Sequence, residues 1–281
     1  MPGTLFVVAT PIGNLEDITV RALRVLREVS VIAAEDTRRT AHLLSRYAIT
    51  TPTTSLHEHN ERGKSASLVA RLQRGESVAL VSDAGTPTVS DPGGLLIRAA
   101  IGAGVRIEPL PGPSAVLTAL AASGLPTDSF SFQGFPPTRS KDRKSWFARL
   151  RELRGTIVFF ESPHRIESTL RDLHRELGDW PVVVGRELTK IHEEFVRGPI
   201  SEIVHGEFHG RGEFTVVIDI GLLPEHISVV APILTDIVAE FGVMTKTNGL
   251  TRRMAINAIA KRHSLAPNRV YKILEEAKKS G

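Results

Sequence analysis

Polar residues suited to ligand binding gather directly after the apolar runs in the first half of the chain. The runs at 5–9, 30–34, 77–82 and 105–110 lead into TPIGNLEDIT, EDTRRT, SDAGTPTVSDPGG and PGPSA. In an open parallel sheet, ligands bind outside the carboxyl ends of the strands. An ordinary connecting loop needs only one or two turn residues. This density of Gly, Pro, Ser, Thr and Asp therefore predicts a binding edge.

The segment 82–94 carries the strongest of these signals. Asp83 follows its strand directly and can accept hydrogen bonds from sugar hydroxyls or an amine, and Gly85 permits close approach of the backbone to a ligand. Ser90 or Asp91 can cap the next helix, which would explain these two residues without any ligand. Binding is thus the favoured interpretation for Asp83 and Gly85, whereas capping and binding are equally good for Ser90 and Asp91.

The elements that must position these loops follow from hydrophobic periodicity. Residues 1–126 alternate apolar runs with helix-like segments, which predicts a parallel sheet covered by helices on both faces, and Ser114 is expected to cap a helix that Gly124 ends. Residues 127–222 repeat this α/β character, and strands are expected at 156–162, 181–188 and 213–221. A linker is expected at 222–232, and residues 223–281 are expected to form the last domain, which combines this linker with a small helical part.

The helical domain has a simple predicted layout. Thr251 is placed to cap a helix that runs to Arg262, and a second helix is expected to start at Pro267 or Asn268. Two short helices joined by a tight turn resemble a helix-turn-helix, and a helical pair docked on the preceding domain is an equally good interpretation.

Charge is distributed unevenly along the chain. The 281 residues carry a net charge of +4, but residues 139–154 hold seven Lys/Arg against two acidic residues and residues 251–281 hold eight against two. The two segments contribute +5 and +6, so the remainder carries −7. Basic segments on an acidic body indicate a polyanionic partner, and solvated helical faces are the alternative. Trp146, inside the first segment, is expected to be a core residue.

Several classes of protein are excluded by composition. The chain has no cysteine, which rules out disulfides, thiolate metal sites, iron–sulfur clusters and a cysteine nucleophile. No apolar run approaches about 18 residues and the first residues lack a basic leader, so we expect a soluble, unprocessed, cytoplasmic protein. His57 and His59 could face a metal from one strand, but without a third ligand we expect no metal site.

Six segments in register carry a family resemblance: FVVATPIGNLEDIT, IAAEDTRRT, LVSDAGTPTVSDPG, PLPGPSA, FFESPHRI and GRELTKIHEE. Together they resemble the ribosomal RNA small-subunit methyltransferase I family, within the tetrapyrrole methylases, over residues 4 to about 221. The resemblance implies two α/β domains of the class III methyltransferase type, with S-adenosylmethionine in the cleft between them, and a homodimer. It also implies methyl transfer to the ribose 2′-hydroxyl of cytidine 1402 in 16S rRNA of the small ribosomal subunit.

The resemblance also implies which residues line the cofactor site. For Phe160 and Leu188, core packing is an equally good interpretation. The first domain would supply Pro11, Asp83, Gly85, Thr86, Pro87, Ser90, Asp91, Ser114 and Ala115, and the second would supply Phe160 and Leu188.

A poorly acidic ribose hydroxyl needs a base or an orienting group within about 3 Å. Glu187 and Arg186 are the favoured candidates because they directly follow an apolar strand, and Glu161 and His164 are further candidates. Lys190 and Asp36 are candidates as well. Structural explanations are open for these candidates: a Glu161–Arg165 pair, a Glu187–Lys190 pair, and Asp36 as a helix cap. The residues expected to contact RNA are Arg38, Arg39, His57, His59, Asn60, Arg165, Arg186 and Lys190.

Two other functions are compatible with the sequence. A methyltransferase for a tetrapyrrole or another small acceptor would share the cofactor loops, but it would not need basic segments. A non-catalytic RNA-binding or ribosome-assembly protein would depend mainly on the helical tail and would show no heat on titration with S-adenosylmethionine.

Overall fold

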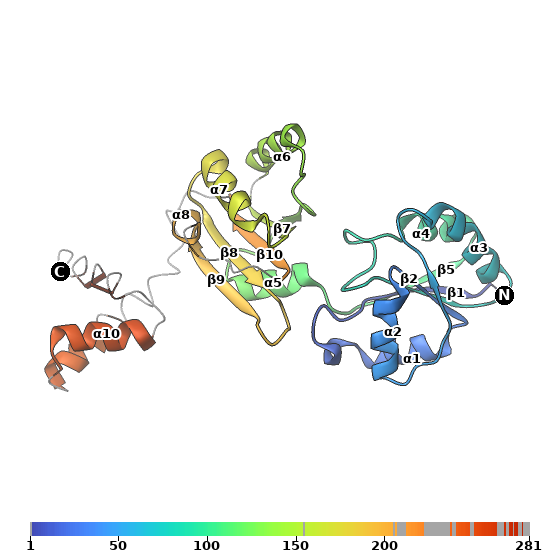
Figure 1. Cartoon of the computed structure of the whole chain (residues 1–281), viewed down its shortest axis with the longest axis horizontal. Coiled ribbons are helices and arrows are strands. Elements are labelled where there is room, and N and C mark those ends of the chain that lie inside the picture. Colours follow the sequence, from blue (N-terminus) through green and yellow to red (C-terminus); the bar gives the residue numbers. More distant parts are fainter. Residues whose placement is uncertain are drawn as a thin grey trace. The chain divides into compact units, whose positions relative to one another are not determined.

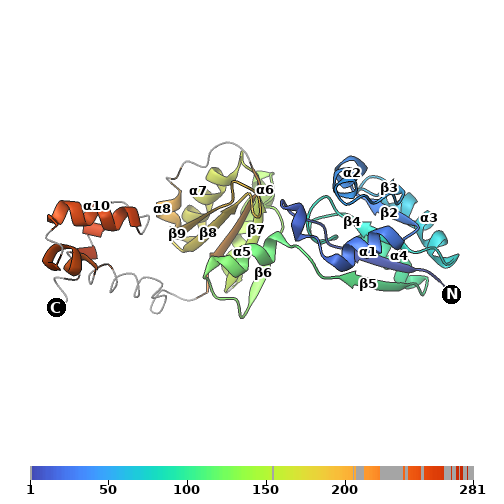
Figure 2. The same ribbon diagram turned by 90° about the horizontal axis from the view of Figure 1, so that it is seen from below.

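The computed structural model describes residues 2–153, 155–204, 206, 212–221, 237, 240–247, 250–262, 267, 270–271, 273–274 and 277. The chain divides into two compact units, Met1–Leu222 and Leu223–Gly281, called here the first and second unit (Figures 1 and 2). No helix in the described ranges has both the length and the apolar character needed to cross a membrane. The predicted linker at 222–232 lies outside the described residues.

The first sheet of the first unit is entirely parallel, with the strand order β3-β2-β4-β1-β5. Four of its strands form at the predicted apolar runs. The additional edge strand β3 has the sequence TTS and therefore offers no apolar run to predict it. The strands are β1 (Thr4–Val8), β2 (Val31–Ala34), β3 (Thr53–Ser55), β4 (Val78–Val81) and β5 (Arg106–Leu110).

Helices cover both faces of this sheet, as predicted. Alternate β2 residues point to opposite faces, so Ile32 packs with Leu26 in one core while Val31 packs with Leu68 in the other. The first core is closed by α1 (Val20–Glu28) and α2 (Thr37–Arg46), and the second by α3 (Glu61–Gln73) and α4 (Gly94–Gly102); a short 3-10 helix, η1 (Leu15–Asp17), follows β1.

The second sheet of the first unit is mixed, with the order β6-β7-β10-β8-β9. Only β6 and β7 run parallel, and the other neighbours are antiparallel. The sequence does not indicate β9, because EFVRGP mixes charged, aromatic and turn residues. The strands are β6 (Phe130–Phe132), β7 (Thr156–Glu161), β8 (Pro181–Arg186), β9 (Glu194–Pro199) and β10 (Phe214–Asp219).

Three helices cover one face of the second sheet: α6 (Ser140–Glu152), α7 (Ile166–Leu177) and α8 (Ile200–Ile203). Trp146 of α6 is only 1% exposed, which confirms its predicted place in the core. The basic charge of α6 is partly used within the fold, because Arg143 pairs with Asp172 at 2.8 Å.

The other face of the second sheet is covered by α5 (Ala115–Ser123). Ser114 caps this helix by accepting the Leu117 N–H, and Gly124 ends it in the left-handed region at a φ of 74°, both as predicted. Val116 and Leu120 pack against Val217 of β10. The helix that follows the last strand of the first sheet therefore belongs to the core of the second.

The second unit is helical where it is described. The helix α10 (Arg252–Arg262) begins after Thr251, whose Oγ1 accepts the Met254 N–H at 3.4 Å, which confirms the predicted cap. A π-helical turn, Val243–Thr247, precedes it, and the described residues between 267 and 277 are also helical. Ile256, Ile259 and Val270 are buried together in the small core of this unit.

Candidate functional site

A cavity of about 300 Å³ in the first unit, called here the large cavity, gathers most of the predicted cofactor residues. Its predicted members are Gly85, Thr86, Ser90, Asp91, Ser114, Ala115, Phe160 and Leu188. It is also lined by residues that were not predicted as cofactor ligands: Ile12, Ala84, Val89, Val116, Phe135, Glu161, Ser162, Pro163, Gly212, Glu213, Phe214 and Thr215.

A second cavity of about 210 Å³, called here the small cavity, shares Ile12, Ala84 and Glu213 with the large one. The predicted cofactor residues Pro11 and Asp83 line this cavity, whereas Pro87 lines neither. Its full lining is Thr10, Pro11, Ile12, Gly13, Leu15, Arg39, Thr40, His42, Leu43, Ser82, Asp83, Ala84, Lys190 and Glu213.

The loops after β1 and β4 are fixed to each other where the two cavities meet. Thr10 and Gly85 exchange two backbone hydrogen bonds of 2.9 Å, and the Thr10 hydroxyl donates to the Ser82 carbonyl at 3.0 Å. Thr88 and Ser90 then adopt φ values of 71° and 66°. Such left-handed conformations are costly for residues other than glycine and concentrate at functional sites.

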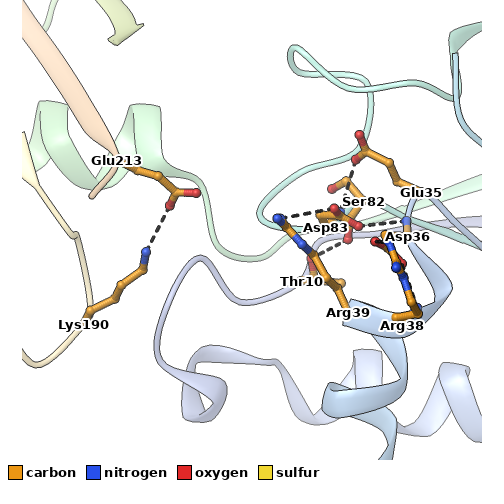
Figure 3. A network of polar contacts seen from close by, with 9 residues as sticks. All are labelled: Thr10, Glu35, Asp36, Arg38, Arg39, Ser82, Asp83, Lys190 and Glu213. Carbon is orange, nitrogen blue, oxygen red and sulfur yellow. Dashed lines mark hydrogen bonds and ion pairs between the residues drawn. The ribbon is translucent and has the colours of Figure 1, made fainter. Parts of the chain in front are cut away.

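Asp83 is held by the loop after β2 (Figure 3). Its carboxylate accepts the Asp36 N–H at 2.9 Å and forms an ion pair with Arg39 at 3.3 Å. Asp36 itself caps α2, and its hydrogen bonds with Arg38 lower its pKa to about 2. Asp36 is therefore a helix cap, as its structural interpretation predicted, and Arg38 is its partner.

The helix cap predicted at Ser90 or Asp91 is wrong. The buried side chain of Glu61 caps α4 instead, because its Oε1 accepts the N–H groups of Gly93 and Leu95 at 3.0 and 2.7 Å. The helix begins too late for the two residues to reach those groups. Ser90 and Asp91 instead line the large cavity.

Asp91 differs from the other carboxylates of the large cavity. Burial raises the pKa of Asp91 to about 6, and the nearby carboxylates of Glu35 and Asp83 add to this effect while a hydrogen bond with Ser82 opposes it. Glu161 and Glu213, the two other acidic residues of the lining, each pair with a cation. No cation in the described part of the chain pairs with Asp91.

Glu161 has no free carboxylate oxygen. One oxygen pairs with Arg165 at 2.8 Å and accepts the Ser162 N–H at 2.7 Å, and the other accepts the Thr169 hydroxyl at 2.6 Å. The pairing proposed as the structural explanation is thus confirmed, and it anchors the start of α7. A part for Glu161 in proton transfer stays a prediction that these contacts do not support.

Lys190 lies between two carboxylates, 2.9 Å from that of Glu187 and 3.1 Å from that of Glu213. Figure 3 shows the pair with Glu213. Burial opposes the charge on Glu187, but the hydrogen bonds from Lys190 and from the Glu213 N–H outweigh it and lower the pKa of Glu187. Burial likewise opposes the charge on Lys190, and the two carboxylates outweigh it and raise the pKa of Lys190. The predicted Glu187–Lys190 pair is therefore present, and Glu187 lines neither cavity.

The loop that carries Lys190 is bound to the loop after β1. The Asn14 N–H donates to the Thr189 hydroxyl at 2.9 Å, and a methyl group on Gly13 would lie 2.5 Å from Cγ of Lys190. Glu187 and Thr189 have φ values of 50° and 65°, so this loop is strained as well.

Several predicted residues lie away from both cavities. His164 and His59 are exposed, and Asn60 uses its side chain to close the turn before α3, where its Oδ1 accepts the His57 N–H at 3.0 Å. Arg186 pairs with Glu194 at 3.4 Å. Among the described residues no group of three or more His, Asp or Glu side chains is placed to hold a metal ion.

Sequence reasoning missed two kinds of lining residue. The ring of Phe135 lies 5.4 Å from that of Phe160. Phe135 lies in the loop after β6, and this strand of three residues is too short to be recognised in the sequence. Gly212 and Glu213 precede β10, which is antiparallel to β7 and β8, so its amino end lies at the carboxyl ends of those two strands. A search of strand carboxyl ends alone cannot find them.

The chain is similar to known methylases over most of its length. A family model described as Tetrapyrrole (Corrin/Porphyrin) Methylases matches residues 4–204. A relative from Synechocystis sp., named Ribosomal RNA small subunit methyltransferase I, is 43% identical over 283 residues, which cover 99% of this chain and 100% of the relative. A relative of the same name from Halalkalibacterium halodurans is 48% identical over 219 residues, which cover 77% of this chain and 76% of the relative.

Solved structures show the same fold. The uroporphyrin-III C-methyltransferase of Thermus thermophilus, in complex with S-adenosylhomocysteine, matches 77% of this chain and 97% of its own with a TM-score of 0.56 and 19% identity. A diphthine synthase matches 77% and 90% with a TM-score of 0.58 and 17% identity. The predicted fold class is confirmed.

Proposed function

The chain belongs to the tetrapyrrole methylase family, and from this premise we propose that it methylates the ribose 2′-hydroxyl of cytidine 1402 in 16S rRNA. It is a methyltransferase that depends on S-adenosylmethionine. The name shared by relatives that match nearly the whole chain carries the choice of ribosomal RNA over a small acceptor.

The large cavity fits the cofactor in size and chemistry. Pockets that bind small molecules and cofactors have volumes of about 300 Å³ or more, and they combine apolar walls with a few polar groups. Apolar side chains such as Val116, Phe160 and Leu188 suit the adenine, and the carboxylate of Asp91 suits a cation. Bound there, S-adenosylmethionine supplies a sulfonium methyl group that is open to attack by a hydroxyl oxygen. The predicted cofactor residues that line this cavity would hold it.

The residues around Lys190 would hold the acceptor in place. An in-line displacement is accelerated chiefly by alignment of the reacting atoms, and strain in the 84–91 and 187–190 loops favours fixed geometry. We retain Glu187 and Arg186 as residues that contribute to methyl transfer. Glu187 acts through Lys190 as a positioning residue. Full activity in a Glu187→Ala variant would remove Glu187 from this assignment.

Methylation of isolated small ribosomal subunits with labelled S-adenosylmethionine tests the function. We expect label on the ribose of cytidine 1402 when the modified nucleotide is mapped. Label on another nucleotide would overturn the assigned position, and absence of label despite cofactor binding would favour a small acceptor. Absence of binding heat would favour a non-catalytic RNA-binding protein.

We also propose a cytoplasmic homodimer, as the family resemblance implies. Half-exposed apolar side chains such as Leu117 of α5, at 55%, are suited to a subunit interface. The mass in solution, measured by light scattering, tests the dimer.

The surfaces that we propose for RNA contact are the exposed Arg39 at the small cavity and the basic segments 139–154 and 251–281.

A further inference from the structure

The two cavities meet at three residues, of which Glu213 alone can ionise. The other two shared residues, Ile12 and Ala84, are apolar. A methyltransferase must bring its cofactor and its acceptor together at one point, so the reacting atoms belong where the two cavities adjoin. Figure 3 shows Glu213 on the side of Lys190, opposite the cluster of Thr10, Ser82 and Asp83.

The structure assigns Glu213 as the group that accepts the proton of the attacking ribose hydroxyl, with the acceptor nucleotide in the small cavity. This inference rests on the proposed function. As the proton moves from the hydroxyl to the Glu213 carboxylate, the oxygen–carbon bond forms and the methyl–sulfur bond breaks, with its electron pair left on sulfur. The side chain of Glu213 is 73% exposed, so solvent can remove the proton afterwards.

The backbone of Glu213 is held firmly at the start of β10. Its N–H donates to the Glu187 carboxylate at 3.0 Å, and its carbonyl accepts the Glu187 N–H at 3.0 Å. Lys190 fixes the carboxylate from one side at 3.1 Å. A site built on a strand end and supported by a second layer of contacts keeps its geometry better than one on a free loop.

Competing carboxylates are less well placed. Asp83 lines only the small cavity and is engaged by the Asp36 N–H and Arg39. Asp91 lines only the large cavity, and Glu161 is buried with both oxygens in use. Among the described residues, Glu213 is thus the carboxylate that borders both cavities and is engaged by a single side chain.

The test compares Glu213→Gln with a matched variant, Glu167→Gln. Glu167 is also an exposed glutamate in an ion pair, with Arg171 at 3.7 Å, and it lines neither cavity. General-base catalysis contributes about 10²–10⁴-fold, so we expect Glu213→Gln to lower kcat on small subunits by at least about 100-fold. The affinity for S-adenosylmethionine, measured calorimetrically, should fall far less than kcat, because the charge of the exposed Glu213 is screened by solvent and offset by Lys190.

Two further readouts separate proton transfer from a structural role. The acid limb of the wild-type kcat–pH profile should be absent in Glu213→Gln, and Glu213→Asp should restore part of kcat. Wild-type kcat in Glu213→Gln, or an equal loss in Glu167→Gln, overturns the inference while leaving the proposed function intact. A wild-type enzyme that labels no small subunit overturns the proposed function itself, and the inference with it.

Discussion

At the scale of single residues, the large cavity is distinguished by the charge of Asp91. The carboxylate has a raised pKa because it is buried near Glu35 and Asp83, and a hydrogen bond with the neutral Ser82 opposes this shift. A cationic ligand would relieve this unfavourable charge. The charge of Asp91 therefore suits the sulfonium cofactor that we propose for this cavity.

Replacement of Asp91 by asparagine should weaken binding of S-adenosylmethionine about tenfold at pH 7.5, because the shape is kept and the charge is lost. For the wild type, affinity should fall as the pH drops below 6, where Asp91 takes up a proton. Calorimetric titration from pH 5 to pH 8 measures both effects. S-adenosylhomocysteine, which lacks the sulfonium charge, should lose less affinity, and an equal loss for both ligands would contradict a role for charge.

The same variant should stabilise the protein without ligand. The folded-state pKa of Asp91 is about 6, above the ordinary value of 3.8, so the folded chain binds this proton more tightly than the unfolded chain. The ionised carboxylate therefore destabilises the fold fully above pH 6, and this cost declines progressively as the pH falls from 6 to 3.8. We expect Asp91→Asn to raise the free energy of unfolding at pH 8 by roughly 1 kcal/mol, reduced by partial solvation. Denaturant titrations should show a smaller gain at pH 5, and the gain should vanish only below the ordinary value of 3.8.

At the scale of elements, the start of α4 shows how a distant side chain replaces a local cap. Glu61, in α3, is 7% exposed and accepts the N–H groups of Gly93, Leu95 and Leu96. A sequence window around α4 cannot show this, because the acceptor lies more than 30 residues earlier. Asp91 is thereby left free to face the large cavity.

Removal of this cap should be costly. Glu61→Ala leaves buried N–H groups without an acceptor, so we expect a loss of about 2–3 kcal/mol in the free energy of unfolding. Glu61→Gln keeps one oxygen acceptor and should lose less than half as much. Urea denaturation measures both variants, and equal stability of the two would show that the hydrogen bonds at α4 are not the cause.

The contact between the loops after β1 and β8 gives a second prediction for elements. A Cβ at Gly13 would lie 2.5 Å from Cγ of Lys190 and 2.9 Å from the Leu188 carbonyl oxygen, so Gly13→Ala must displace the Lys190 loop. We expect a loss of about 1–3 kcal/mol in stability and a lower methylation rate. Gly63→Ala is the matched control, because no atom lies within 4 Å of its Cβ and alanine is favoured in the helix α3. Equal behaviour of the two variants would contradict the role of this contact.

At the scale of the whole molecule, the sequence predicts elements better than it predicts how they combine. Apolar runs identify four strands of the first sheet, and Ser114 and Thr251 mark helix starts correctly. Packing of α5 on the second sheet and the antiparallel entry of β10 depend on contacts between distant segments. For this reason Asp91 could be proposed from the sequence, whereas Glu213 could not.

The division of the chain into two units leads to a last prediction. The described residues that line the two cavities belong to the first unit, while the segment 251–281 of the second carries +6. A chain that ends at Leu222 should therefore bind S-adenosylmethionine as the full chain does, but bind small subunits at least tenfold more weakly at 50 mM salt. Each lost phosphate contact removes about 0.7–0.9 from the slope of log affinity against log salt, so the shortened chain should also depend less on salt. Affinities measured between 50 and 200 mM salt test both effects.

Replacement of the exposed Lys141 and Lys144 of α6 by glutamine in the full chain should reduce the slope by a smaller amount. An unchanged affinity and slope in the shortened chain would assign RNA binding to the first unit alone.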